Sequence, residues 1–234
     1  MSELKSRMKV IAGLCPKCDV LFDIGCDHAR ISIELIKKGY AGFAVASDIN
    51  KGPLNAASEN AVKEGLADRM EFVLSDGFKE IDVKESTGKF KSSAAIITGM
   101  GGELIEKILE EGRDKHKYID DFIFSPQSKL NGFRKYLGAS GFSIQEESIV
   151  SDRGKLYFVI KCRHGKDSCQ SEADYELGPD FFDKKNELKK KYLEDRILLY
   201  EDLCRNKKID EESLNKYKEM LQLYLQARDR YEMS

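Results

Sequence analysis

The chain has 234 residues, with 39 basic and 41 acidic side chains and a formal net charge of −2. This length fits one catalytic domain with a modest appendage. No apolar run approaches the roughly 18 residues needed to span a bilayer. The first nine residues also lack the apolar core of a signal peptide, which predicts a cytoplasmic protein. The near-neutral charge excludes a uniformly basic nucleic-acid binder, but a local basic patch would suffice for binding.

The six cysteines include one pair with ligand-like spacing, Cys15 and Cys18. No second close Cys or His pair completes a zinc site, so no metal is expected. A redox pair is the alternative, but Cys15 and Cys18 precede the first predicted strand instead of following it. We therefore expect a reduced, unreactive segment before the sheet.

Short apolar runs alternate with amphipathic segments from about residue 8 to residue 138. The predicted strands are Val20–Ile24, Phe43–Asp48, Met70–Ser75, Ala94–Thr98 and Asp121–Ser125. The predicted helices between and after them are Ala29–Lys38, Asn55–Glu64, Gly101–Arg113 and Lys129–Leu137. This alternation predicts an α/β fold with right-handed βαβ crossovers and a mostly parallel sheet.

The pattern changes after Gly141. Two strand-like runs, 142–151 and 155–162, are joined by Asp152, Arg153 and Gly154, which predicts an antiparallel hairpin. Five parallel strands followed by such a hairpin form the order of a Rossmann-like class I methyltransferase sheet. A dehydrogenase would continue with parallel strands instead.

The C-terminal part is charged and helical. Apolar residues recur every three or four positions over 193–204 and over 214–231, which predicts a two-helix antiparallel coiled coil. Asp210 suits the N-cap of the second helix. Because the apolar seams are thin, we expect this coiled coil to pack on the catalytic domain or on a partner. The predicted parts are a methyltransferase domain, a polar linker and a helical domain, over 1–164, 165–179 and 180–234.

Three acidic residues, Asp23, Asp48 and Asp76, come at the ends of the first three predicted strands. The carboxyl ends of parallel strands meet at one edge of a sheet, so these side chains are expected to line one ligand site. S-adenosylmethionine suits them, because it carries a cation, a ribose diol and an adenine. Asp23 would fix the turn or meet the amino group, Asp48 would bind the ribose and Asp76 the adenine amino group. A turn-capping role is the alternative for each acid.

Glycine turns accompany these acids. We expect Gly25 to bring backbone amides toward the methionine end of the ligand, and Gly77 to leave room for the adenine ring. The second and third glycines of a dinucleotide fingerprint are missing, which argues against a pyrophosphate ligand. The residues expected to bind the cofactor are Asp23, Gly25, Cys26, Asp27, Asp48, Ile49, Asp76, Gly77, Gly99 and Met100.

Asp27 and His28 are the candidate catalytic residues. Asp27 would orient the reacting groups or stabilise charge on the product, and capping of the next helix is the alternative for both residues. The fourth predicted strand is followed by small residues, 99–102, and not by the Asn/Asp-Pro-Pro-aromatic segment that grips an exocyclic amine. This favours an acceptor such as a ring nitrogen, which has no proton to remove. The segment 125–128 would either bond a base edge or form a simple turn.

Several of these segments together resemble the bacterial tRNA (adenine(22)-N1)-methyltransferases. They are the helix before Cys15-Pro16, the segment 23–29, Gly52-Pro53 with Ala56, and the segments 65–69, 75–77 and 99–105. The resemblance covers about residues 4–162. It implies a class I methyltransferase domain with a C-terminal coiled coil, S-adenosylmethionine as cofactor, and N1 of an adenine in the D-arm region of tRNA as acceptor. The turn 125–127 departs from the family's Gln-Pro-Asn, and Asp48 replaces a frequent Glu.

A tRNA substrate requires cationic contacts to its phosphates. The candidate contacts on the first helix and the tail are Lys5, Arg7, Lys9, Lys184, Lys185, Lys189 and Lys190. The tail carries as many acidic as basic groups, so binding would depend on how the charges segregate. The alternatives are a methyltransferase for another RNA or a small molecule, and a non-catalytic adaptor that retains the fold.

Overall fold

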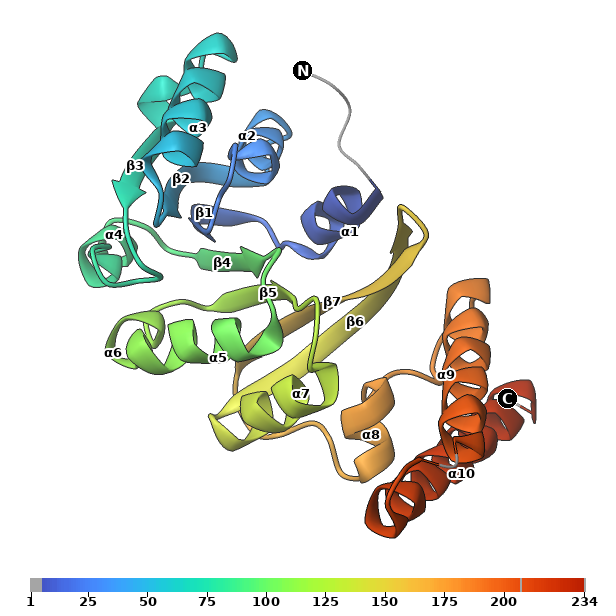
Figure 1. The fold of residues 1–234 in the computed structure, drawn as a ribbon. Helices are drawn as coiled ribbons and strands as arrows, with labels where there is room; N and C mark the ends of the chain where they lie inside the picture. Colours follow the sequence, from blue (N-terminus) through green and yellow to red (C-terminus); the bar gives the residue numbers. More distant parts are fainter. Residues whose placement is uncertain (1–5, 207, 234) are drawn as a thin grey trace.

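A computed structural model describes residues 6–206 and 208–233. It contains a seven-stranded sheet in the order β3-β2-β1-β4-β5-β7-β6, covered by helices on both faces (Figure 1). The strands are β1 (Cys18–Ile24), β2 (Ala41–Asp48), β3 (Met70–Leu74), β4 (Ser93–Thr98), β5 (Asp121–Ser125), β6 (Phe142–Asp152) and β7 (Lys155–His164). Strands β1 to β5 pair in parallel, and β7 is antiparallel to both β5 and β6. The prediction of a Rossmann-like methyltransferase sheet is therefore confirmed.

The helices of the sheet region are α1 (Ser6–Leu14), α2 (Arg30–Lys37), α3 (Lys51–Lys63), α4 (Val83–Gly88), α5 (Gly102–Glu111), α6 (Arg113–His116) and α7 (Leu130–Ala139), with a short 3₁₀ helix at Ala67–Arg69. Strand β1 is buried on both faces. Leu21 belongs to the apolar cluster under α1, α2 and α3, whereas Phe22 belongs to the cluster under α5 and α7. Parallel strands covered on both faces read as continuous apolar runs, which explains the sequence pattern.

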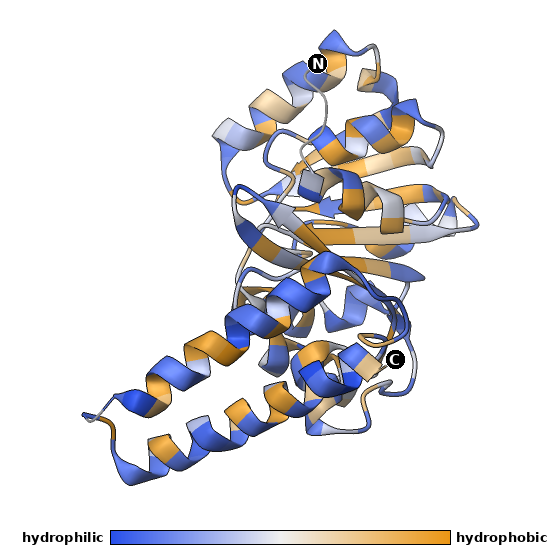
Figure 2. Cartoon of the chain, turned by 90° about the vertical axis from the view of Figure 1, so that its right-hand side faces the viewer, coloured by the Kyte–Doolittle hydropathy of each residue, from blue (hydrophilic) through white to orange (hydrophobic). Residues whose placement is uncertain are grey.

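The two C-terminal helices, α9 (Glu187–Arg205) and α10 (Glu211–Met233), form an antiparallel pair whose connecting turn projects away from the sheet (Figure 2). Asp210 accepts a hydrogen bond from the Ser213 backbone N–H at 2.8 Å, as expected of an N-cap. Leu193 and Tyr224 pack in one buried cluster with Phe158 of the β6–β7 hairpin. The expectation that the coiled coil packs on the catalytic domain is confirmed.

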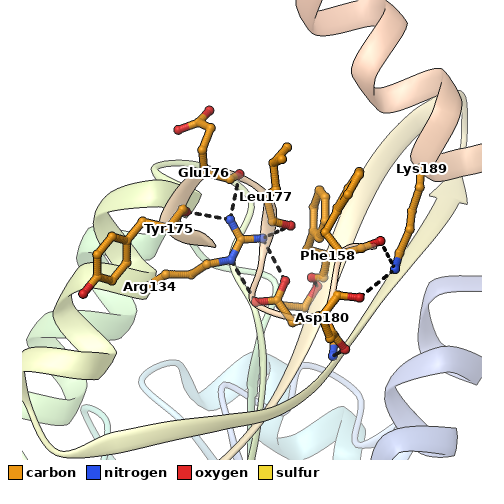
Figure 3. Close-up of polar contacts among 10 residues, drawn as sticks. Arg134, Phe158, Tyr175, Glu176, Leu177, Asp180 and Lys189 are labelled. Carbon is orange, nitrogen blue, oxygen red and sulfur yellow. Dashed lines mark hydrogen bonds and ion pairs between the residues drawn. The ribbon is translucent and has the colours of Figure 1, made fainter. Parts of the chain in front are cut away.

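A short helix, α8 (Glu172–Leu177), lies within the segment predicted as a linker. It sits beside α7, where the buried Arg134, which is ion-paired with Glu147, also bonds to α8 (Figure 3). Arg134 Nε and Nη2 each donate to a Glu147 carboxylate oxygen at 2.8 Å, and Arg134 Nη1 donates to the carbonyls of Tyr175 and Glu176 at 2.9 Å. The Arg134 side chain is fully buried. This junction fixes how the helical tail leaves the sheet.

Within the described ranges, no helix combines the length and the apolar character that crossing a bilayer requires.

Candidate active site

A cleft of about 500 Å³ opens at the carboxyl ends of β1 to β5. Its walls come from the ends of these five strands, the segments that follow them, and α1. His28 lines this cleft. So do all ten residues predicted to bind a cofactor, which are Asp23, Gly25, Cys26, Asp27, Asp48, Ile49, Asp76, Gly77, Gly99 and Met100. Their assembly follows from the parallel order of the strands, which brings their ends to one edge.

The turn after β1 requires glycine. Gly25 has a φ of +74°, and a Cβ there would overlap the Cε of Met100. Its amide and that of Cys26 donate to the Ser47 carbonyl, at 2.9 and 2.8 Å. The β1–β2 hydrogen bonding thus continues past the end of β1 and uses these two amides, and the role expected of Gly25 toward the ligand stays a prediction. The Met100 side chain lies over the turn.

Asp23 lies beneath the cleft, with only 5% of its surface exposed. It accepts a hydrogen bond from the Ser32 hydroxyl on α2. Burial raises the pKa of Asp23 to about 6, and the Ser32 hydrogen bond offsets part of this while the nearby charges of Asp48 and Asp27 add to it. Of the two roles expected for Asp23, the hydrogen bond to α2 supports fixing the turn.

Asp48 and Asp76 also line the cleft and are less buried than Asp23. One Asp48 oxygen accepts a hydrogen bond from the Asn50 backbone N–H at 2.8 Å, and its Oδ2 has no partner among the described residues. Asp76 pairs with Lys79, whose hydrogen bond lowers the pKa of that carboxyl. Next to it, Gly77 has a φ of +63°, and a Cβ there would lie 3.0 Å from an Ile108 methyl group. Both carboxylates thus present acceptor oxygens at the cleft wall.

Asp27 and His28 lie in the loop before α2, where the backbone is strained at Asp27 and Ala29. Asp27 and Ala29 adopt positive φ angles of 52° and 50°, a region that non-glycine residues seldom occupy outside turns and functional sites. Helix α2 begins after Ala29 with no side-chain cap. The capping alternative for Asp27 and His28 is therefore wrong. The Asp27 side chain is 70% exposed, and its Oδ1 lies 3.5 Å from His28 Nε2.

The ends of β4 and β5 form the remaining wall. Ser125 is buried, and its hydroxyl donates to the Phe158 carbonyl at 3.0 Å, so it cannot reach a bound base. Gln127 lines the cleft instead. Its backbone N–H donates to the Met100 carbonyl at 2.9 Å. Of the two options for segment 125–128, contact with a base edge is excluded for Ser125 by its burial but stays open for the exposed Gln127.

Cationic side chains line one rim of the otherwise acidic cleft. Arg7 stands 4.7 Å from the centre of the Tyr157 ring, and Arg30 is the first residue of α2. Sequence reasoning proposed Arg7 for phosphate contact but missed Arg30, together with Asn50 and Thr98, which also line the cleft. The available signals were the position of Asn50 and Thr98 at predicted strand ends and the position of Arg30 at the start of a predicted helix.

The other cations proposed for RNA contact have different surroundings. Lys189 is buried, and its Nζ donates to the Phe181 carbonyl at 2.7 Å (Figure 3), so its assignment to a phosphate is wrong. Lys184 is exposed, 4.0 Å from Glu146, and Lys185 lies 5.7 Å from the centre of the Tyr231 ring. The exposed side chains also include Lys9 and Lys190, whereas Lys5 lies outside the described residues.

Cys15 and Cys18 are buried, unpaired thiols at the start of β1. Hydrogen bonding with Cys18 and burial raise the pKa of the Cys15 thiol, which suppresses the reactive thiolate. Across the described part of the chain, no group of three His, Cys, Asp or Glu side chains is placed to hold a metal ion.

Comparison with known proteins identifies the family. The model of the family TrmK, tRNA (adenine(22)-N(1))-methyltransferase, matches residues 21–229. The chain belongs to this family. It is 31% identical over 193 residues to the tRNA (adenine(22)-N(1))-methyltransferase of Bacillus subtilis strain 168, covering 80% of this chain and 79% of that protein.

Two solved structures of similar proteins contain the donor or its product. One is Streptococcus pneumoniae Sp1610 in complex with S-adenosyl-L-methionine, with a TM-score of 0.84 and 26% identity, over 95% of this chain and 98% of that chain. The other is M. capricolum TrmK with S-adenosyl-homocysteine, with a TM-score of 0.83 and 25% identity, over 98% of this chain and 100% of that chain. The cofactor of the family is therefore S-adenosylmethionine.

Proposed function

We propose that this protein transfers a methyl group from S-adenosylmethionine to N1 of adenine 22 in the D-arm region of tRNA. The observation that carries the proposal is the convergence of Asp23, Asp48 and Asp76 on one cleft in a chain of the TrmK family. A tRNA substrate would also place the protein in the cytoplasm.

The residues present fit S-adenosylmethionine. Four carboxylates line the cleft, which favours a cationic ligand over a phosphate-bearing one: Asp23, Asp27, Asp48 and Asp76. Asp48 offers a free carboxylate oxygen for ribose hydroxyl groups, next to the exposed Ile49. The volume of about 500 Å³ lies within the usual range for cofactor sites.

When bound, the cofactor supplies an electrophilic methyl group on a sulfonium. The side chains of this cleft do little covalent chemistry, because adenine N1 is already nucleophilic and carries no proton. Their main contribution is positioning, which supplies about 7–11 kcal/mol in favourable cases. Methylation leaves the base cationic, and the exposed Asp27 carboxylate would stabilise that charge. His28, whose Nε2 lies 3.5 Å from Asp27 Oδ1, would orient this carboxylate.

The tRNA must present its adenine in this cleft, which costs a few kcal/mol if the base is unstacked from the folded arm. Arg7 and Arg30 at the rim would bind the phosphates beside the extruded nucleotide. The helical part, residues 180–234, would bind the tRNA body further away through Lys184, Lys185 and Lys190. These contacts would be weakened by salt.

The test is incubation of the full chain with labelled donor and tRNA transcripts carrying adenosine or guanosine at position 22. We expect N1-methyladenosine, identified by nucleoside mass spectrometry, from the adenosine transcript alone. Label in N6-methyladenosine, or equal labelling of both transcripts, would contradict the proposal. Donor binding without methylation of any RNA would favour the adaptor alternative.

A further inference from the structure

The Gln127 side chain is an unused amide at the wall of the cleft. It follows β5 and lines the cleft together with Thr98 and Met100. Its backbone is fixed by the hydrogen bond to the Met100 carbonyl, and its side chain makes no hydrogen bond with any described residue. Its exposed position beside the glycine segment 99–102 leaves both ends of the amide available to a bound group.

The chemistry of the acceptor limits which edge of the base the protein can contact. The N1 lone pair must face the methyl donor, so a protein hydrogen bond to N1 would block the reaction. Recognition of adenine then falls on the edge formed by the N6 amino donor and the N7 acceptor. A glutamine amide matches this edge with one acceptor and one donor, whereas guanine presents two acceptors there.

The other polar side chains of the cleft match this edge less well. Asp27 and Asp48 are carboxylates that can accept from N6 but cannot donate to N7. Asn50 belongs to the β2 end of the cleft, beside Asp48, and Ser125 is buried against the Phe158 carbonyl. Among the described residues that line the cleft, Gln127 is the amide on the β4–β5 side.

We infer that Gln127 selects adenine by a two-point hydrogen bond to N6 and N7 of the target base. The inference rests on the proposed function and assigns its base specificity to one side chain. Gln127 is a specificity-determining residue and not a source of chemical catalysis. Its loss should therefore reduce kcat/KM for tRNA without altering the affinity for S-adenosylmethionine.

The test pairs a protein variant with an altered base. Wild-type protein and Gln127→Ala are assayed on tRNA assembled with adenosine or with 7-deazaadenosine at position 22, which lacks the N7 acceptor. When 7-deazaadenosine replaces adenosine, we expect kcat/KM of the wild type to fall about 10-fold more than kcat/KM of Gln127→Ala. The 7-deaza change also alters N1 basicity, but this affects both proteins alike and cancels in the ratio.

A matched control is Gln145→Ala. Gln145 is an exposed glutamine at the bulge of β6, which β7 separates from β5, and it does not line the cleft, so Gln145→Ala should behave as wild type. Equal 7-deaza losses in wild type and Gln127→Ala, or unchanged activity of Gln127→Ala on adenosine tRNA, would overturn the inference. Failure of the wild type to form N1-methyladenosine would instead contradict the proposed function itself.

Discussion

Two polar regions of this molecule differ in exposure and in hydrogen bonding: one is buried and fully bonded, and the other is exposed and leaves polar atoms without a partner in the described part of the chain. At the junction of sheet and tail, Arg134 and Glu147 are buried and bonded to each other and to backbone carbonyls. At the cleft, the carboxylate of Asp27 is exposed, and Oδ2 of Asp48 and the side chain of Gln127 have no hydrogen-bond partner among the described residues. A satisfied buried network stabilises and orients, whereas unsatisfied polar groups gathered in a cleft are available to a ligand.

The comparison predicts that changes at the junction reduce stability and that changes at the cleft reduce binding. Both regions belong to one folded unit, because α7 and the β6–β7 hairpin connect them. A loss of ligand binding must therefore be compared with the stability of the same variant. Measurements of unfolding and of ligand binding on the same variants therefore separate them.

The largest effect is expected from Glu147→Leu. The change leaves the buried Arg134 guanidinium without its carboxylate, which should lower the free energy of unfolding by about 3–5 kcal/mol. Denaturant unfolding measures the loss. The control is Glu172→Gln, which breaks an exposed ion pair with Lys135, a residue of α7 next to Arg134. This change should lower the free energy of unfolding by no more than about 1 kcal/mol. Similar losses from both variants would contradict the distinction.

Asp23→Asn should stabilise the fold in the absence of ligand. The folded pKa of Asp23, about 6, lies above its ordinary value of 3.8, so ionisation costs stability as the pH rises through this window. The wild type should lose on the order of 3 kcal/mol relative to Asp23→Asn by pH 7.5, and less at pH 4.5. Unfolding measured at both pH values checks this. A difference between the proteins that does not change with pH would exclude the buried carboxylate as its cause.

Asp48→Ala should separate binding from stability. Loss of a charged acceptor for the ribose hydroxyl groups should weaken donor affinity about 10- to 100-fold, with little change in unfolding. Isothermal titration with S-adenosylmethionine measures the affinity, and the exposed Asp202→Ala on α9 is the control. Unchanged donor affinity would remove Asp48 from the ribose site.

The smallest effect is expected from Arg7→Gln. Loss of one phosphate contact should weaken tRNA binding several-fold and reduce the slope of log affinity against log salt by about 1. Lys117→Gln, at the amino end of β5 and away from the cleft, is the matched charge control. If both variants show the same salt slope, Arg7 contributes only to the general charge of the protein.

The sequence predicted the parallel sheet, the hairpin and the gathering of strand-end acids, because these follow from period and spacing. It did not predict α8, whose segment has few apolar residues, nor the burial of Arg134 and Lys189. Such charged residues are usually exposed. The carbonyls that bind Arg134 lie 41 and 42 residues away in sequence, whereas those that bind Lys189 lie 8 and 9 residues before it. The sequence also could not show that the amides of Gly25 and Cys26 donate to the Ser47 carbonyl, because this bonding depends on the register of β1 and β2.

The most direct test of the account is a crystal structure of this protein with S-adenosyl-homocysteine. We expect the ligand in the cleft at the carboxyl ends of β1 to β5, with its ribose hydroxyl groups within hydrogen-bond distance of Asp48 and its sulfur facing the Asp27 side of the cleft. A ligand bound elsewhere, or a ribose turned away from Asp48, would contradict it.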